Sequence, residues 1–212
     1  MSRTGSALPV LVFAKAPRPG HAKTRLIPVL GADGAAALHA RLIRLTLRTA
    51  RRAALGPVEL HGAPADDDFL RFCAASYGAG LVPQSDGDLG ARMNGALDDA
   101  LRVSACAILV GTDCPALTAH HLRLAAAALH DGFDAVFVPT EDGGYALVGL
   151  RRCDPRLFEG IAWSTRAVMS QTRDRLAALD WRWTELERLW DIDTGPDYER
   201  LLASGLLDGR QV

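Results

Sequence analysis

The chain has 212 residues, 49% of them hydrophobic, which is long and apolar enough to bury the core of one α/β domain. Its 24 basic and 25 acidic residues nearly balance, so the sequence shows no broad positive surface of the kind that binds nucleic acid or an anionic membrane. We therefore expect a small-molecule partner, with no nucleic acid and no membrane.

Hydrophobic periodicity divides the first half of the chain into strands that alternate with helices. A buried strand at residues 8–14 is followed by a loop rich in proline and glycine and then by a long amphipathic helix. Asp88 is placed to cap the third helix. The remaining elements of this half are strands at 58–61, 80–83 and 105–111 and helices at 33–54, 66–75 and 88–102.

The second half begins with a helix that Thr118 is placed to cap and that runs to residue 130. Two strand-like runs follow, joined by the short sequence "TEDGG", which favours antiparallel pairing over a crossover connection. The elements predicted here are strands at 135–139, 144–150 and 182–186, a mostly helical region at 155–178, and a final helix opened by "DTGPDYERLLA". The whole pattern predicts a three-layer α/β/α fold with a mostly parallel mixed sheet, whose ligand binds beyond the carboxyl ends of the strands.

One domain is expected over residues 1–212, with 1–7 and 205–212 as loose tails. The apolar run at 8–14 contains Pro9 and is too short for a secretory signal or a membrane-spanning helix. The four cysteines lack the spacing of a CxxC pair or a metal finger, which suits a reducing compartment. We therefore expect a cytoplasmic protein, and the sequence predicts no oligomeric state.

The loop "AKAPRPGHAKTRL" brings three cations together after the first strand. Lys15 and Lys23 are the only two lysines of the chain, and Arg25 follows closely. Lysine supplies a compact charge and arginine a two-pronged donor, so the set suits a diphosphate or triphosphate. A Walker A loop is excluded because Ala22 stands where that motif needs glycine. The alternative is a surface loop whose charges are simply solvated.

Asp113 follows a buried strand in the sequence "CAILVGTDCPALT". A carboxylate at the open end of such a strand is costly to desolvate unless something pairs with it. Thr118 already stands at the start of the next helix, which leaves Asp113 free to bind a hard cation such as Mg²⁺ or Mn²⁺. The alternative is an aspartate that stabilises a turn.

Five segments together resemble the DUF2064 family of nucleotide-diphospho-sugar transferases, which includes glycosyltransferases of arsenosugar biosynthesis. The segments are "KAPRPGHAKTRL", "QSDGDLGARM", "GTDCPAL", "EDGGYALVGL" and "DIDTGPDYERL". The resemblance spans roughly residues 8–204, and the joint order of the segments is more specific than any one of them. It implies a fold of the glycosyltransferase-A type.

The resemblance also implies roles for the charged residues. The nucleotide phosphates would be contacted by Lys15, Lys23 and Arg25. Asp113 would bind Mg²⁺ or Mn²⁺. Lys23 and Asp113 would also be catalytic residues. Asp193 would supply a second carboxylate to the metal ion. This sequence has Gly-Pro after the threonine of "DIDTGPD", where Pro-Glu is usual, so Asp193 could instead be a residue favoured at a helix start.

The segment "QSDGDLGARM" stands where such folds contact the nucleotide base. Gly87 and Gly90 would allow close approach of the backbone, and Arg92 could reach ribose or phosphate. A helix start capped by Asp88 accounts for the same residues, and both interpretations can hold at once.

The segment "EDGGYALVGL" is expected on the acceptor side. Asp142 is the preferred candidate to accept a proton from the attacking hydroxyl or to join the metal ligands, and Gly143 and Gly144 would contact the acceptor. An ordinary hairpin turn uses the same Asp-Gly and Gly-Gly pairs.

The block "AWSTRAV" resembles another block of the same family. Trp163 would line the acceptor pocket and Ser164 would cap a helix while contacting the acceptor. Core packing explains the tryptophan equally well.

The function expected from these residues is transfer of a glycosyl group from a nucleotide-diphosphate sugar to a small acceptor with a divalent metal. An alternative is nucleotidyl transfer from a nucleoside triphosphate with release of pyrophosphate, because "AKTRL" also resembles 2-phospholactate guanylyltransferases. A second alternative is a nucleotide-binding protein without catalytic activity.

Overall fold

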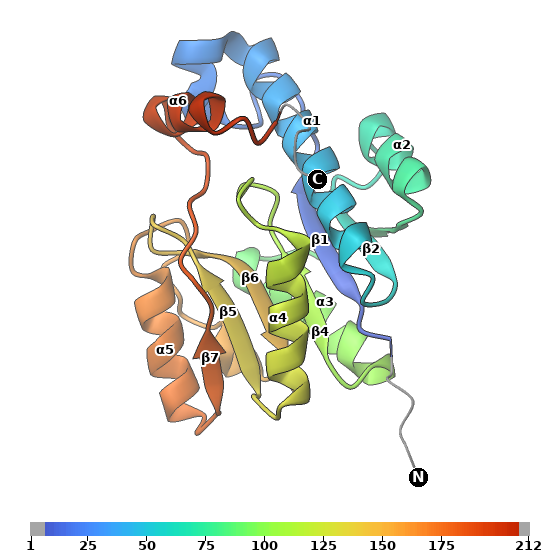
Figure 1. Ribbon diagram of the computed structural model, residues 1–212, viewed down its shortest axis with the longest axis vertical. Helices are drawn as coiled ribbons and strands as arrows, with labels where there is room; N and C mark the ends of the chain where they lie inside the picture. The colour runs from blue at the N-terminus through green and yellow to red at the C-terminus, as the bar shows by residue number, and fades with distance from the viewer. Residues whose placement is uncertain (1–6, 208–212) are drawn as a thin grey trace.

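A seven-stranded sheet lies at the centre of the structure, a computed structural model that describes residues 7–207 (Figure 1). The strand order is β3-β2-β1-β4-β6-β5-β7, and only β6 runs antiparallel to its neighbours. The mostly parallel mixed sheet predicted from the sequence is therefore confirmed. The strands are β1 (Val10–Lys15), β2 (Val58–Ala63), β3 (Gly80–Pro83), β4 (Ala107–Val110), β5 (Ala135–Pro139), β6 (Tyr145–Leu150) and β7 (Trp183–Glu185).

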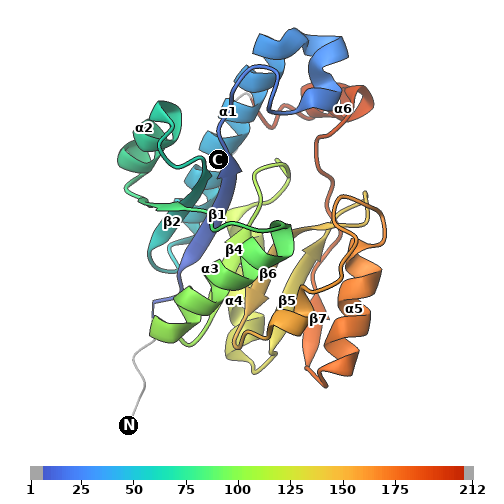
Figure 2. The ribbon, with the colours of Figure 1, turned by 180° about the vertical axis from the view of Figure 1, so that it is seen from behind.

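Helices cover both faces of this sheet, as Figures 1 and 2 show from opposite sides. The buried side chains of α1, α2 and α4 form one hydrophobic cluster against the sheet, and those of α3 and α5 form another on the opposite face. Strands that are buried on both faces need continuous apolar runs, which is what β1, β4 and β5 have. The helices are α1 (Ile27–Ala53), α2 (Asp68–Tyr77), α3 (Leu89–Val103), α4 (Ala119–His130), α5 (Val168–Ala178) and α6 (Gly195–Ser204), with 3₁₀ turns at Thr24–Leu26 (η1) and Pro155–Leu157 (η2).

Helix α1 begins six residues before the predicted start at Asp33 and bends at Gly31. Gly31 has φ 70° and ψ 170°, a conformation that glycine adopts without steric penalty. The segment before the bend and α6 form a small cluster of their own beyond the sheet, centred on Leu26, Leu38 and Leu201. This part of the molecule stands above the carboxyl ends of the strands (Figure 1).

By length and composition alone, the stretch Thr24–Ala53 is apolar enough to cross a membrane. The sequence had predicted no such segment. In the fold, the later turns of α1 bury Ile43, Leu47 and Ala50 in the main core. These buried residues account for part of the apolar character of α1.

The predicted tails lie mostly outside the described residues, since 1–6 and 208–212 are not among them. Leu206 and Leu207, which were assigned to the loose C-terminal tail, are partly buried against the cluster of α1 and α6. Helix α6 ends at Ser204, and its C-cap Gly205 has a φ of 65°, which is typical of a helix C-terminus.

The region 155–178 was predicted to be mostly helical, but only η2 and α5 are helical there. Gly160 and Ser164 both have positive φ, of 67° and 63°, which interrupts a right-handed helix. Helix α5 begins at Val168, with Ala167 as its N-cap. The prediction that Ser164 caps a helix is therefore wrong.

The register of β1 and β4 brings their carboxyl ends together. Val12 pairs with Val110, so Lys15 and Asp113 each lie three residues beyond the same point of the sheet. The chain leaves β1 toward β2 on one side, while β4 lies on the other. The ends of β1 and β4 therefore form the switch point at which open α/β sheets bind ligands.

Gly149 in β6 provides a test of this packing. A Cβ atom there would come within 2.7 Å of Val136 Cγ1 and 3.2 Å of Ile108 Cγ1. We expect Gly149→Ala to lower the free energy of unfolding by about 1–3 kcal/mol, because the core would be overpacked. The measurement is urea denaturation.

The matched control is Gly80→Ala in the edge strand β3. A Cβ atom there meets only Glu59 Cγ, at 3.8 Å, so this variant should be neutral or slightly stabilised. Equal losses for both variants would contradict the packing described for β6.

Candidate active site

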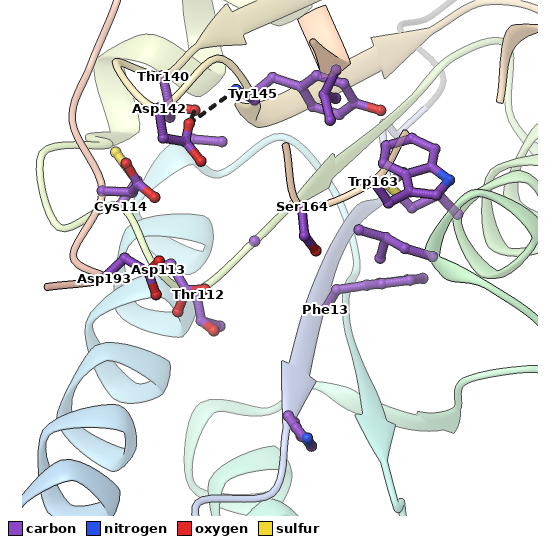
Figure 3. A pocket seen from close by; sticks show the side chains of 18 of the residues that line it. Phe13, Thr112, Asp113, Cys114, Thr140, Asp142, Tyr145, Trp163, Ser164 and Asp193 are labelled. Atoms are coloured by element: carbon purple, nitrogen blue, oxygen red, sulfur yellow. Dashed lines mark hydrogen bonds between the residues drawn. The ribbon is translucent and has the colours of Figure 1, made fainter. Parts of the chain in front are cut away.

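A cavity of about 510 Å³ opens at the carboxyl ends of β1 and β4 (Figure 3). It collects side chains from both ends of the chain, including several that the sequence did not single out. Of the predicted site residues, the structure brings these to its wall: Lys15, Arg25, Asp113, Asp142, Gly144, Trp163, Ser164 and Asp193. Lys23, Gly87, Gly90, Arg92 and Gly143 do not line it.

Lys23 contacts Asp113 directly. Its ammonium group lies 2.8 Å from Asp113 Oδ1 and also donates a hydrogen bond to the carbonyl oxygen of Ile192. The lysine side chain is only 5% exposed, whereas that of Asp113 is 55% exposed. The ammonium therefore lies behind the carboxylate and leaves the outer side of Asp113 open to the cavity.

Arg25 and Asp193 form a second ion pair, at the more exposed rim of the cavity. The backbone N–H groups of Asp193 and Thr194 both donate to Asp197 Oδ2. Thr194 and Asp197 form the capping box of α6. Because Thr194 and Asp197 cap α6, the carboxylate of Asp193 takes no part in capping and instead lies at the cavity wall, where it pairs with Arg25.

Asp142 lies in the turn between β5 and β6. Its Oδ1 accepts hydrogen bonds from Thr140 Oγ1 at 2.5 Å and from the Gly144 N–H at 2.9 Å (Figure 3). Gly143 packs so closely that a Cβ atom would lie 2.3 Å from the Arg166 carbonyl oxygen. Gly143 is thus needed for chain packing, while Asp142 keeps one oxygen uncommitted beside the cavity.

Asp191 is a functional candidate that the sequence analysis missed. It lines the cavity with Asp113 and Asp142 and is half-buried. Burial, followed by the negative charge of Asp142, raises the pKa of Asp191 from 3.8 to about 6. Its place two residues before Asp193 in "DIDTG" was the one available signal.

His39 in α1 was also missed, since a lone histidine in an apolar helix carries no signal in the sequence. Its Nε2 lies 2.9 Å from the Lys15 carbonyl oxygen, and its Nδ1 lies 3.9 Å from Asp113 Oδ1. Burial lowers the pKa of His39, although the charge of Asp113 opposes the shift. The neutral ring therefore holds the end of β1 and faces the carboxylate.

The segment 84–93 reaches the cavity through residues other than those predicted. Arg92 Nε donates to the Gly87 carbonyl oxygen at 2.9 Å, so this side chain folds back on its own loop. A Cβ atom on Gly90 would meet the Trp163 ring at 2.8 Å, which makes Gly90 a close-packing position. The residues of this segment that line the cavity are Gln84, Leu89 and Met93.

The far wall of the cavity is aromatic. Tyr145 and Trp163 pack edge to face with ring centroids 6.5 Å apart. Ser164 follows in a left-handed conformation and points into the space between Trp163 and Asp113 (Figure 3). A strained residue at a cavity wall is a common feature of binding sites.

Unpartnered polar atoms gather at this cavity. In the part of the chain that the structure describes, three buried side-chain nitrogen or oxygen atoms have no hydrogen-bond partner: His39 Nδ1, Tyr145 Oη and Trp163 Nε1. All three belong to residues that line the cavity. An unpaired buried group costs about 1–3 kcal/mol, so water or ligand atoms that bond to these three groups would be favoured here.

Carboxylates are the groups at the cavity wall, within the described residues, that best suit Mg²⁺. Within residues 7–207, no group of three or more histidine, cysteine or acidic side chains converges as a complete metal cage. Asp113 and Asp193 nevertheless supply carboxylate oxygens, the donors that Mg²⁺ and Mn²⁺ prefer. Each of these carboxylates is also ion-paired to a cation, Asp113 to Lys23 and Asp193 to Arg25, so an ion bound here would take most of its coordination from substrate phosphates and water.

Solved structures with the same fold include three of interest. A protein from Desulfovibrio desulfuricans G20, provisionally assigned as a nucleotide-diphospho-sugar transferase, is 29% identical with a TM-score of 0.86, covering 94% of this chain and 88% of its own. A cytidylyltransferase from Leptospira borgpetersenii is 14% identical with a TM-score of 0.58, covering 92% and 85%. Glucosyl-3-phosphoglycerate synthase from Mycobacterium tuberculosis, in complex with Mn²⁺ and uridine diphosphate, is 10% identical with a TM-score of 0.55, covering 97% and 78%.

These neighbours are transferases, and their likeness confirms the fold of nucleotide-diphospho-sugar transferases. No curated protein matches the sequence. The family described as "Uncharacterized protein conserved in bacteria (DUF2064)" matches residues 46–165, which is more than half of the chain. The predicted membership of the DUF2064 family is thereby confirmed; three of the five sequence segments fall inside the matched range, and the chain belongs to this family.

Proposed function

We propose that the protein is a transferase that moves a glycosyl group from a nucleotide-diphosphate sugar to a small acceptor. One observation carries this proposal: Lys15 at the end of β1, Arg25 in η1 and carboxylates from three other segments share one cavity at the switch point of the sheet. The likeness to the Desulfovibrio transferase supports it.

The donor side of the reaction is assigned to Lys15 and Arg25. Their positive charges would hold the diphosphate and stabilise the negative charge that develops as it leaves. Asp113 and Asp193 would hold Mg²⁺ or Mn²⁺, which neutralises diphosphate oxygens when bound. Lys23 supports this arrangement by fixing Asp113 from behind.

The acceptor side is assigned to the turn after β5 and the aromatic wall. Asp142 and Asp191 are the carboxylates that could accept a proton from the attacking hydroxyl. The raised pKa of Asp191, about 6, would let it exchange a proton near neutral pH. Trp163 and Ser164 would contact the acceptor, and Gly144 leaves room for it.

Nucleotidyl transfer is the second candidate, because a cytidylyltransferase shares the fold. The two reactions differ in product. Incubation with nucleotide-diphosphate sugars, Mn²⁺ and a panel of small acceptors should release nucleoside diphosphate, measured by anion-exchange chromatography. Pyrophosphate released from nucleoside triphosphates would instead establish the second candidate, and nucleotide binding without turnover would indicate a binding protein.

Substitution of Lys15 tests the phosphate site. Lys15→Met should weaken the binding of nucleoside diphosphates by roughly tenfold or more, because a charge-assisted hydrogen bond is lost. The measurement is isothermal titration calorimetry. Arg102→Met is the control: this exposed arginine near the end of α3 pairs with Asp98 outside the cavity, and an equal loss there would refute the assignment.

The charge of Asp191 gives a prediction about stability. A folded-state pKa of about 6 means that the folded protein binds more protons than the unfolded chain between about pH 4 and 6. Stability therefore falls as the pH rises through this window, and the ionised carboxylate destabilises the fold at neutral pH. Asp191→Asn should raise the free energy of unfolding at pH 7.5 by roughly 1 kcal/mol, after allowance for the partial exposure of the side chain.

Urea denaturation of the wild type and Asp191→Asn checks this prediction. The gain should become small at pH 3.5, where Asp191 is protonated in the folded protein and largely protonated in the unfolded chain. A gain of the same size at both pH values would show that the charge of Asp191 is not its cause.

A further inference from the structure

The cavity has a charged part and an apolar part. Asp113 and Asp142 lie on one side of it (Figure 3). The rings of Phe13 and Trp163 lie on the other side, with Ser164 between the two parts. The side chains of the apolar part are Phe13, Leu89, Met93, Leu109, Tyr145 and Trp163. The proposed function assigns the charged part to the diphosphate and the acceptor hydroxyl, and it leaves the chemical class of the acceptor open.

The floor of the apolar part is continuous with the hydrophobic core. Phe13 of β1, Met93 of α3 and Leu109 of β4 line the cavity although each is at most 8% exposed. All three belong to the hydrophobic cluster on the face of the sheet that α3 and α5 cover. A ligand group that fills this part of the cavity therefore meets carbon atoms, and burial of apolar surface against them is favourable.

The wall of the apolar part consists of two rings that are held in place. Tyr145 packs edge to face on Phe137, with ring centroids 5.1 Å apart, and the Trp163 ring lies against the backbone of Gly90. Burial raises the pKa of the Tyr145 hydroxyl, so that group stays neutral. Apart from Tyr145 Oη and Trp163 Nε1 the two rings offer only carbon. A strongly hydrated ligand such as a free sugar would lose more hydrogen bonds to water than it gains there.

Leu89 extends the apolar part to the mouth of the cavity. It is the first residue of α3, it lines the cavity and it is 44% exposed. A single exposed leucine is ordinary on a protein surface, but this one faces the same cavity as the buried Met93. An apolar group bound in the cavity would remove the Leu89 side chain from water, which is favourable.

We infer that the acceptor is an alcohol or phenol whose non-reacting part is apolar, and that this part packs against Leu89, Met93 and Trp163. The inference rests on the proposed function, because it takes this cavity as the site of glycosyl transfer. In the reaction the acceptor oxygen forms a bond to the anomeric carbon of the sugar. The bond from that carbon to the diphosphate breaks, and the nucleoside diphosphate leaves with its electron pair. The hydroxyl proton passes to Asp142 or Asp191.

The experiment titrates the full-length protein with the straight-chain alcohols butanol, hexanol and octanol, and with glycerol and glucose as polar comparisons. Binding is followed by NMR at the indole N–H of Trp163, which is assigned by its loss in Trp163→Phe. Each buried methylene group should strengthen binding about fourfold, so affinity should rise with chain length. Binding of glycerol or glucose as tight as that of hexanol, or affinity independent of chain length, would overturn the inference.

Leu89→Ser is the test variant, because Leu89 is partly exposed and its replacement removes apolar contact without opening a hole in the core. Hexanol binding should weaken by roughly fivefold or more. Val103→Ser is the matched control: Val103 is an apolar residue of the same helix, 83% exposed, and it does not line the cavity. An equal loss in both variants, or no loss in Leu89→Ser, would overturn the inference.

Titration of the same samples with uridine, guanosine and cytidine diphosphates separates this inference from the proposed function. A nucleoside diphosphate and hexanol should bind together, and Leu89→Ser should leave the affinity for the diphosphate unchanged. If the two compete, or if Leu89→Ser weakens both equally, the apolar part holds the nucleotide base; that result overturns the inference and leaves the proposed function standing. Chain-length-dependent binding of alcohols without binding of any nucleoside diphosphate would support the apolar site and argue against the transferase.

Discussion

The site depends on one buried ammonium group. Lys23 reaches from the loop after β1 to the carboxylate of Asp113 and to the backbone carbonyl of Ile192. The Ile192 N–H in turn donates to the Asp113 carbonyl oxygen at 2.9 Å. Three segments far apart in the sequence are thus fixed by one cation. Loss of the Asp113 carboxylate would leave the buried ammonium without its counter-charge, which is destabilising. Lys23 also adopts a left-handed conformation that costs about 1–2 kcal/mol outside glycine, which its contacts must offset.

Local chemistry made much of the fold predictable. The caps at Asp88 and Thr118 were recognisable because capping uses side chains within a few residues, and both helices begin where those caps place them. The strands were recognisable from their buried apolar runs. The bend at Gly31 and the loop from 158 to 167 were not, because they depend on single residues with positive φ, which hydrophobic periodicity does not reveal.

The sequence identified several charged residues of the candidate site but not the ion pairs that they form. Lys15, Arg25 and Asp113 reach one cavity as the strand ends suggested. No pattern in the sequence could show that the side chain of Lys23 turns inward, because that direction depends on the position of Ile192, far along the chain. His39 escaped notice for the same reason: its importance comes only from its place beside Asp113.

The scarcity of lysine has a practical consequence for chemical labelling. The chain carries two lysines, of which Lys23 is buried and Lys15 is exposed at the cavity. Apart from the terminal amine, a reagent directed at primary amines would meet one accessible target in the native protein. A fluorophore attached there would report on the mouth of the cavity without any cysteine having to be introduced.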